Sequence, residues 1–382
     1  MSLFNKNTDI DGEVGVIAGL NFGEDIDYSM KELASLCEVA GIHVESELIQ
    51  NLPAPNNATY LGKGKVEELK DYCINNDIDV VVFNDELSGV QLRNLEEILS
   101  VKVIDRTILI LDIFAARAVS KEGKLQVELA QLQYRMPRLA GLGKSLSRLG
   151  GGIGTRGPGE KKLESDRRHI QKRMDNIKKE MKKVAVHREN QRSARRKRET
   201  PVVALVGYTN SGKSAVMNYF LSKTMGKGSD VLEKNILFAT LDAFQRKIKI
   251  APDKEFILVD TVGFVSKLPH GLVEAFKSTL EEVKEADLLL QIMDISQANN
   301  DFQTEVVDSV LKELDAADKK KILVYNKIDL LDISKSEKKA LIKQGPIVND
   351  GREVMYTSAK FGTGMDRLLE RISQIVFEEN NK

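Results

Sequence analysis

The sequence predicts an α/β protein in three parts: an N-terminal α/β domain (1–116), a basic antiparallel helical hairpin (117–199) and a larger α/β domain (200–382). Three observations predict this division. Short apolar segments alternate with amphipathic ones in both end regions, which favours mostly parallel sheets covered by helices. Two helical stripes flank a glycine-rich break in the middle region. A length of 382 residues is also too great for one ordinary core.

The N-terminal domain is expected to alternate strands with helices. Strands are predicted at 14–19, 42–49, 79–83 and 101–104, and helices at 30–39, 65–74 and from the capping residue Ser88 to about residue 99. Tyr60–Lys65 contains a Gly-Lys-Gly-Lys run, but this run lacks the G-K-S/T ending of a phosphate-binding loop and the strand that precedes such a loop. It is interpreted as a basic turn before a helix, with or without a contact to an RNA backbone. The domain is expected to bind or dock, and not to form a second active site.

The middle region has the pattern of two helices packed along one seam. Apolar residues recur at helical spacing, first at Leu125, Leu129, Leu132 and Met136, and then at Leu163, Ile170, Met174, Ile177, Met181 and Val184. Gly150–Gly159 lies between the stripes and is expected at the tip of the hairpin, flanked by Lys144, Arg148, Arg156, Lys161, Lys162, Arg167 and Arg168.

The formal net charge of zero conceals a basic middle between acidic ends. From Arg117 to Glu199 there are 24 Lys and Arg against 9 Asp and Glu. Nucleic acid is the first candidate partner for such a surface, a membrane surface is the second, and a merely solvated helical face remains an alternative.

Composition predicts a cytoplasmic protein. No segment approaches the roughly 20 apolar residues that span a bilayer, and the polar N-terminus lacks the layout of a secretory signal. Cys37 and Cys73 are the only cysteines and lie among apolar helical positions, so they are expected to be reduced core thiols.

The larger domain is organised around Gly207–Ser214, which matches G-x-x-x-x-G-K-S/T at every fixed position. A β-branched run, 202–206, precedes it, and an apolar helical segment, 215–221, follows. The two glycines let successive N–H groups point inward around a polyphosphate. Lys213 is predicted to reach the β- and γ-phosphates, and the Ser214 hydroxyl to ligate Mg²⁺.

Three further motifs follow in the order expected of a GTP-binding domain. Asp260–Gly263 has the D-x-x-G pattern, in which Asp260 holds Mg²⁺ through water and the Gly263 N–H senses the γ-phosphate. Asn326–Asp329 is an N-K-x-D pattern whose aspartate can accept hydrogen bonds from guanine N1–H and its 2-amino group, which adenine does not offer. Ser358–Lys360 is expected to complete the base pocket, and Thr240, in a switch segment, to complete the Mg²⁺ shell.

The predicted site therefore has catalytic residues Lys213, Thr240 and Gly263, Mg²⁺ ligands Ser214 and Thr240, and GTP or GDP as its nucleotide. The predicted nucleotide-binding residues are Gly207, Tyr208, Thr209, Asn210, Ser211, Gly212, Lys213, Ser214, Phe238, Ala239, Thr240, Leu241, Asp242, Asp260, Thr261, Val262, Gly263, Asn326, Lys327, Ile328, Asp329, Ser358, Ala359 and Lys360. Asn210 is a candidate K⁺ ligand, by similarity to potassium-dependent relatives, or a plain loop-stabilising residue.

The sequence resembles the HflX family of ribosome-associated GTPases, in the TRAFAC class and Obg-HflX-like superfamily. The resemblance covers nearly the full length and rests on 105–107, 122–132, 150–160, 166–168, 207–214, 238–242 and 260–264. It implies a monomeric factor that binds the large (50S) ribosomal subunit and its rRNA, not DNA, and that remodels, splits or rescues stalled ribosomes under stress. Some members influence antibiotic sensitivity.

The chain departs from the family pattern at three places. Ala243–Arg246 replaces the usual Pro-Thr-Thr-Arg of the first switch, and Ala215–Met217 replaces Thr-Leu-Phe after the phosphate loop. Because the sequence ends at Lys382, soon after Ser358, the C-terminal domain of longer members is not expected.

Phe264 follows the D-x-x-G glycine, where Ras-like enzymes carry a glutamine that orients water. Hydrolysis is therefore expected to be slow without ribosomes. Three functions remain open from the sequence: a GTPase that splits or remodels ribosomes, an RNA-binding assembly or hibernation factor with little turnover, and a GTPase that docks on protein or membrane. Whether the N-terminal region also binds ATP is open as well.

Overall fold

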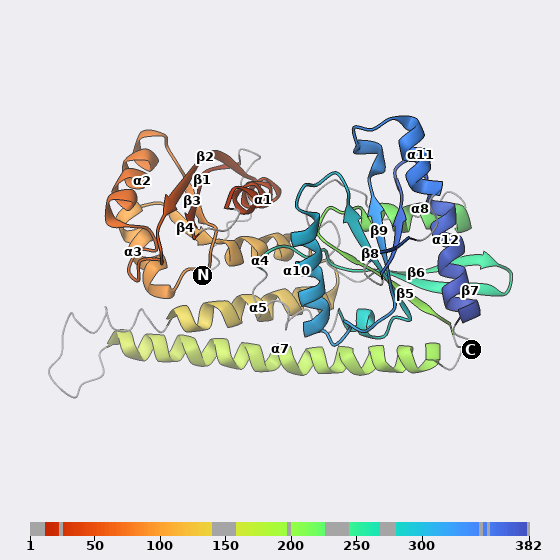
Figure 1. Ribbon diagram of the computed structural model, residues 1–382. Coiled ribbons are helices and arrows are strands. Elements are labelled where there is room, and N and C mark those ends of the chain that lie inside the picture. The colour runs from red at the N-terminus through yellow and green to blue at the C-terminus, as the bar shows by residue number, and fades with distance from the viewer. Residues whose placement is uncertain are drawn as a thin grey trace. The chain divides into compact units, whose positions relative to one another are not determined.

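The computed structural model describes residues 12–22, 26–139, 158–196, 200–225, 244–267, 280–343, 347–349 and 352–379. The chain divides into two compact units, Met1–Ala116 with Val127–Lys178 and Arg117–Gln126 with Lys179–Lys382. The helices of the middle region thus contribute to both units (Figure 1). The division into three domains at residues 116 and 199 stays a prediction.

The first unit contains a four-stranded, fully parallel sheet in the order β2-β1-β3-β4. The strands are β1 Glu13–Asn21, β2 Ile42–Asn51, β3 Val80–Phe83 and β4 Lys102–Asp105, and the helices are α1 Ile26–Val39, α2 Lys63–Asn75, α3 Gly89–Leu99 and α4 Arg106–Arg117. Four strands and three helices match the predicted pattern. Helix α4 was not expected, because its sequence is apolar on nearly every side and most of its residues are buried.

Local signals explain two of these elements. Ser88 caps α3 with a capping box, in which its hydroxyl accepts from the Gln91 N–H while the Gln91 side chain accepts from the Ser88 N–H. Gly62 is the N-cap of α2, so Lys63, Gly64 and Lys65 of the Gly-Lys-Gly-Lys run form the first turn of the helix, which begins two residues earlier than predicted. Cys37 and Cys73 are free and buried, as predicted, and burial raises the pKa of the Cys37 thiol to about 12.

The middle region forms the two predicted helices, α5 Lys121–Leu139 and α7 Pro158–Arg196. Glu128 pairs with Arg173 at 2.6 Å and Lys121 pairs with Glu180 at 3.2 Å. The earlier residue of α5, Lys121, pairs with the later residue of α7, Glu180, so the two helices run antiparallel. Buried seam residues are Leu125, Leu129, Met174 and Ile177. Helix α5 continues through Pro137, and residues 140–157, including most of the glycine-rich tip, lie outside the described residues.

The second unit contains a seven-stranded sheet in the order β10-β11-β9-β8-β5-β7-β6. Strands β5 Val202–Gly207, β7 Lys254–Asp260, β8 Leu288–Asp294, β9 Lys321–Asn326 and β11 Arg352–Tyr356 are mutually parallel. Strand β6 Phe244–Ala251 pairs antiparallel with β7, and β10 Ile347–Asn349 pairs antiparallel with β11. The helices are α8 Lys213–Met225, α10 Asn300–Glu313, α11 Lys335–Lys343 and α12 Met365–Gln374, with a 3₁₀ turn at Ile328–Leu330 and a π-helical turn at Ile375–Glu379.

The core of this unit explains why its motifs meet. Strand β5 is buried along its whole length, and the inward faces of α8 and α12 pack with it through residues such as Phe220 and Leu368. Ligands of open parallel sheets bind at the carboxyl ends of the strands. The segments after β5, β7, β9 and β11 all leave that edge (Figure 1).

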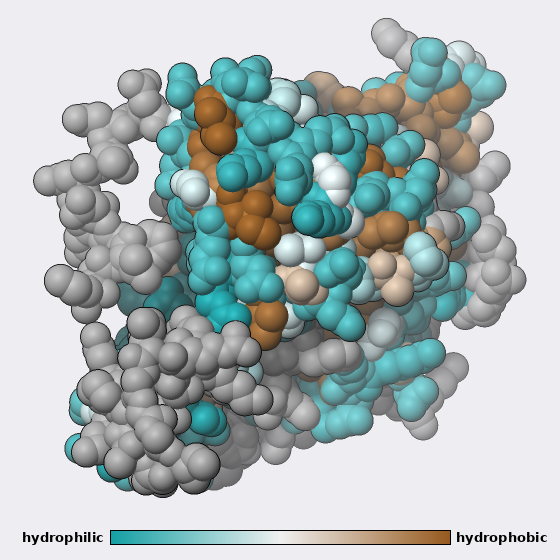
Figure 2. Space-filling model, turned by 90° about the vertical axis from the view of Figure 1, so that its left-hand side faces the viewer, coloured by the Kyte–Doolittle hydropathy of each residue, from teal (hydrophilic) through white to brown (hydrophobic). Residues whose placement is uncertain are grey.

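The face drawn in Figure 2 is mainly hydrophilic. Figure 2 shows one face on which apolar residues form separate groups among hydrophilic ones. Within the described ranges, no helix combines the length and the apolar character needed to cross a membrane.

Candidate nucleotide-binding site

The loop between β5 and α8 adopts a conformation that requires its two glycines. Gly207 has a φ of +146°, and a Cβ at this position would lie 2.2 Å from the Ile292 carbonyl oxygen of β8. Gly212 has a φ of +97°, and a Cβ there would lie 2.2 Å from Asn326 Nδ2. The glycines therefore let the loop press against β8 and the N-K-x-D segment while it curls.

Lys213, the first residue of α8, is held inside this loop. Its Nζ donates to the carbonyl oxygens of Gly207, at 3.1 Å, and Tyr208, at 2.8 Å. The pKa of Lys213 is lowered to about 8, because the lowering by burial outweighs the opposing effect of the Asp260 carboxylate, and nearby Lys327 adds a smaller lowering. A bound polyphosphate would favour the charged form of Lys213 and would therefore raise its pKa again.

Ser214 and Asp260 bring two oxygen groups together at the N-terminus of α8. The Ser214 hydroxyl donates to Asp260 Oδ2 at 2.8 Å, and Asp260, the last residue of β7, is fully buried. Hard oxygen groups of this kind suit Mg²⁺ held by few protein ligands and by phosphate. The donor set therefore fits the predicted ion. Thr240, the other predicted ligand, lies outside the described residues with the whole segment Phe238–Asp242.

The D-x-x-G segment lies directly against the phosphate loop. The Thr261 hydroxyl donates to the Leu205 carbonyl at 2.7 Å, which fixes the end of β7 to β5. A Cβ at Gly263 would lie 2.7 Å from Thr209 Cα and 3.0 Å from Lys213 Nζ. Gly263 is thus placed beside the ammonium group predicted to contact the γ-phosphate, where a larger residue would displace the loop.

Phe264 is part of the core and not of the solvent-facing site. Its side chain is 1% exposed. Its N–H donates to the Gly207 carbonyl at 3.2 Å, and its carbonyl accepts from the Thr209 N–H at 2.7 Å. This pairing extends the contact between the loop and the segment after β7. A phenyl ring has no group that could orient water, and here it points into packed protein.

The base-recognition motifs are joined through Asn326, the last residue of β9. Its Nδ2 donates to the Ser211 carbonyl at 3.1 Å, and its Oδ1 accepts from the Ala359 N–H at 2.9 Å. The Ser358 hydroxyl donates to Asp329 Oδ1 at 2.5 Å, which orients that carboxylate. The structure therefore brings the phosphate loop, the N-K-x-D segment and the S-A-K segment into one connected cluster. Ser358 and Ala359 are buried, whereas Lys360 is exposed.

One contributor was missed from the sequence, Asp294, which pairs with the predicted site residue Lys327. Lys327 has a φ of +63°, and its ammonium group pairs with Asp294 at 2.8 Å. Asp294 ends β8 after an apolar run, the same signal that pointed to Asp260 at the end of β7. Tyr208 was predicted as a residue of the phosphate loop, but the contact of its phenol, whose oxygen accepts from the Ser266 N–H at 2.6 Å, was not. A backbone partner of this kind leaves no pattern in the sequence.

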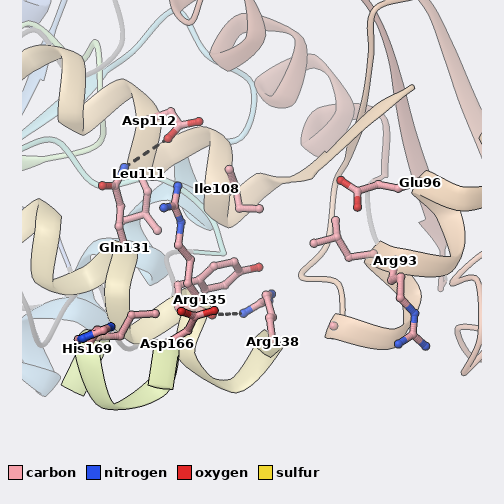
Figure 3. Close-up of a pocket in the computed structure, with 14 residues that line it drawn as sticks. Arg93, Glu96, Ile108, Leu111, Asp112, Gln131, Arg135, Arg138, Asp166 and His169 are labelled. Atoms are coloured by element: carbon pink, nitrogen blue, oxygen red, sulfur yellow. Dashed lines mark hydrogen bonds between the residues drawn. The ribbon is translucent and has the colours of Figure 1, made fainter. Parts of the chain in front are cut away.

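A separate cleft of about 770 Å³ lies in the first unit, between α3, α4, α5 and the start of α7 (Figure 3). Its charged lining is mixed and comprises Arg93, Arg135, Arg138, Glu96, Asp112 and Asp166. The Arg138 guanidinium stacks on the Tyr134 ring, 3.2 Å from its centroid. The cleft contains none of the predicted nucleotide-site residues.

Comparison with known proteins agrees with this architecture. Residues 27–115 match the family described as GTP-binding GTPase N-terminal, residues 117–195 match GTP-binding GTPase Middle Region, and residues 202–327 match 50S ribosome-binding GTPase.

The similar proteins cover most of the chain. The GTPase HflX of Caldanaerobacter subterraneus subsp. tengcongensis is 50% identical over 97% of this chain and 82% of its own length. GTPase HflX of Escherichia coli is 42% identical over 84% of this chain and 74% of its own length. A crystal structure of SsGBP in complex with GDP, 26% identical, superimposes with a TM-score of 0.50 over 95% of this chain and 98% of that one. The chain belongs to the HflX family of GTPases.

Proposed function

We propose that this protein binds GTP and GDP with Mg²⁺ at Gly207–Ser214, hydrolyses GTP, and acts in the cytoplasm on the large ribosomal subunit to remodel, split or rescue stalled ribosomes. The observation that carries the proposal is the cluster in which Asn326 joins the phosphate loop to the S-A-K segment. The GDP bound to SsGBP and the description of the family matching 202–327 as ribosome-binding support it.

Each part of the cluster has a role in this proposal. The loop N–H groups and Lys213 bind the phosphates, and the oriented Asp329 carboxylate accepts two hydrogen bonds from guanine. Ser214 and Thr240 would ligate Mg²⁺ and Asp260 would hold it through water, and the ion would neutralise charge on the β- and γ-phosphates. Asn210, which is exposed and has a φ of +59°, is the proposed K⁺ ligand. GTP turnover that is equal in K⁺ and Na⁺ would remove K⁺ from the proposal.

Hydrolysis is proposed to need the ribosome because Phe264 supplies no polar group. The measurement is GTP turnover with and without purified large subunits. Turnover should rise strongly with large subunits in the wild type and remain at background for Lys213→Ala, which lacks the phosphate-binding charge. Equal turnover with and without subunits would contradict stimulation, while turnover in neither condition would leave only the switch function.

Helix α7 is the proposed RNA-contacting arm. It contains 14 Lys and Arg against 6 Asp and Glu. Its exposed cations include Arg167, Arg168, Lys172, Lys178, Lys179, Lys182 and Lys183. Folded RNA is contacted largely through its shape and backbone, and cationic side chains release counterions from that backbone. Binding to rRNA should therefore weaken steeply with salt.

Sucrose-gradient sedimentation of intact ribosomes separates the remaining functions. Ribosomes that split into subunits when GTP or a non-hydrolysable analogue is added, and not with GDP, would support the splitting function. Nucleotide-dependent attachment to the large subunit without splitting would favour an assembly or hibernation factor. Failure to bind rRNA at low salt would favour docking on protein or membrane.

A further inference from the structure

The phosphate loop and the segment after β7 are attached to each other at more points than the D-x-x-G motif requires. Gly263 packs against Thr209, and Phe264 exchanges backbone hydrogen bonds with Gly207 and Thr209. Beyond these contacts, the Ser266 N–H donates to the phenol oxygen of Tyr208 at 2.6 Å. The Tyr208 and Ser266 side chains are 3% and 4% exposed.

The phenol contact lies at one end of a short segment whose other end faces the proposed γ-phosphate. Gly263 is beside Lys213 Nζ, and Ser266 is three residues further along the chain. Tyr208 belongs to the loop itself, since its carbonyl accepts from Lys213. Tyr208 therefore contacts both parts of the site. Its backbone carbonyl binds the phosphate-binding ammonium group of Lys213, and its phenol binds Ser266 at the far end of the γ-phosphate-sensing segment.

We propose that Tyr208 is a positioning residue that sets the preference of the site for GTP over GDP, by holding Gly263–Ser266 against the phosphate loop. The inference rests on the proposed GTP binding. A segment already held in place loses less conformational freedom when the Gly263 N–H engages a γ-phosphate. GDP has no γ-phosphate, so its affinity does not depend on that segment.

Tyr208→Phe tests the proposal because it keeps the ring and removes the hydroxyl. A buried neutral hydrogen bond changes an equilibrium constant by about fivefold. The affinity for a non-hydrolysable GTP analogue should therefore fall by about fivefold, while GDP affinity stays within about twofold of wild type. Both affinities are measured by titration with fluorescent nucleotides. Amide exchange at Ser266 in the nucleotide-free protein should be faster in the variant.

Tyr219→Phe is the matched control. Its phenol donates to Asp366 Oδ1 at 3.0 Å, between α8 and α12, so this variant also removes one tyrosine hydrogen bond from the same unit. It should leave the ratio of the two affinities unchanged.

The outcomes separate the inference from the proposed function. An equal loss of GTP-analogue and GDP affinity in Tyr208→Phe would show general damage to the loop and overturn the positioning role. An unchanged ratio with unchanged Ser266 exchange would overturn it as well. If the wild type binds neither nucleotide, the proposed function itself fails.

Discussion

Replacing Asn326 with alanine should damage stability and nucleotide binding together. The Asn326 side chain is 2% exposed and contacts the Ser211 carbonyl and the Ala359 N–H. Truncation leaves these two buried backbone groups without their amide partner, and each such loss costs about 1–3 kcal/mol. We therefore expect the free energy of unfolding of the second unit to fall by about 2–6 kcal/mol.

The assay is urea unfolding of the full chain, followed by circular dichroism because the sequence contains no Trp. The transition that moves to higher urea when GDP is added reports the nucleotide-binding unit. Ser222→Ala is the control, since its hydroxyl makes an exposed bond to the Tyr219 carbonyl and should matter by less than about 0.5 kcal/mol. A loss below about 1 kcal/mol for Asn326→Ala would refute the idea that this amide joins the two segments.

Three further predictions concern the same site. Because the pKa of Lys213 is lowered to about 8 and bound phosphates would raise it, GDP affinity should fall about tenfold from pH 7 to pH 9. Calorimetry near pH 9 should detect proton uptake on binding, and a pH-independent affinity without uptake would contradict the assignment. Asp329→Asn should weaken GTP binding by at least about 100-fold, through loss of two charge-assisted hydrogen bonds, and improve binding of xanthosine triphosphate, whose 2-oxygen accepts from the new amide. Failure of the variant to prefer the xanthine nucleotide would count against base recognition at this carboxylate. Gly207→Ala should lower the melting temperature, because the methyl group would lie 2.2 Å from the Ile292 carbonyl, whereas Gly64→Ala, with open space around it, should not. Equal melting temperatures for the two variants would show that the loop can move away from β8.

Elements with a strong local signal were predictable from the sequence. The apolar runs at β3, β5 and β7 and the capping residue of α3 have the patterns that local sequence reading detects. Strand β6 was not predicted, although Ile248 and Ile250 alternate with lysines, because the alternating stretch is short and only Ile248 is fully buried. An edge strand is specified mainly by its partner, here β7.

Buried polar partners could not be predicted because they come from distant parts of the chain. Arg106 in α4 is 1% exposed and donates to Glu32 and Asn84, which are 74 and 22 residues away. The G-x-x-x-x-G-K-S/T, D-x-x-G and N-K-x-D motifs of the candidate site, by contrast, were predicted from their spacing and their order along the chain. Their mutual contacts, such as Ser358 with Asp329, follow from the order of parallel strands, which the sequence only suggests.

The coupling between nucleotide and ribosome is tested most directly by pelleting purified large subunits with wild-type protein or Lys213→Ala, at one low salt concentration. Wild-type protein should pellet with the subunits far more in the presence of a non-hydrolysable GTP analogue than with GDP, and Lys213→Ala should show no nucleotide dependence. Equal pelleting of both proteins under all nucleotide conditions would contradict the account, because the phosphate loop would then have no influence on ribosome binding.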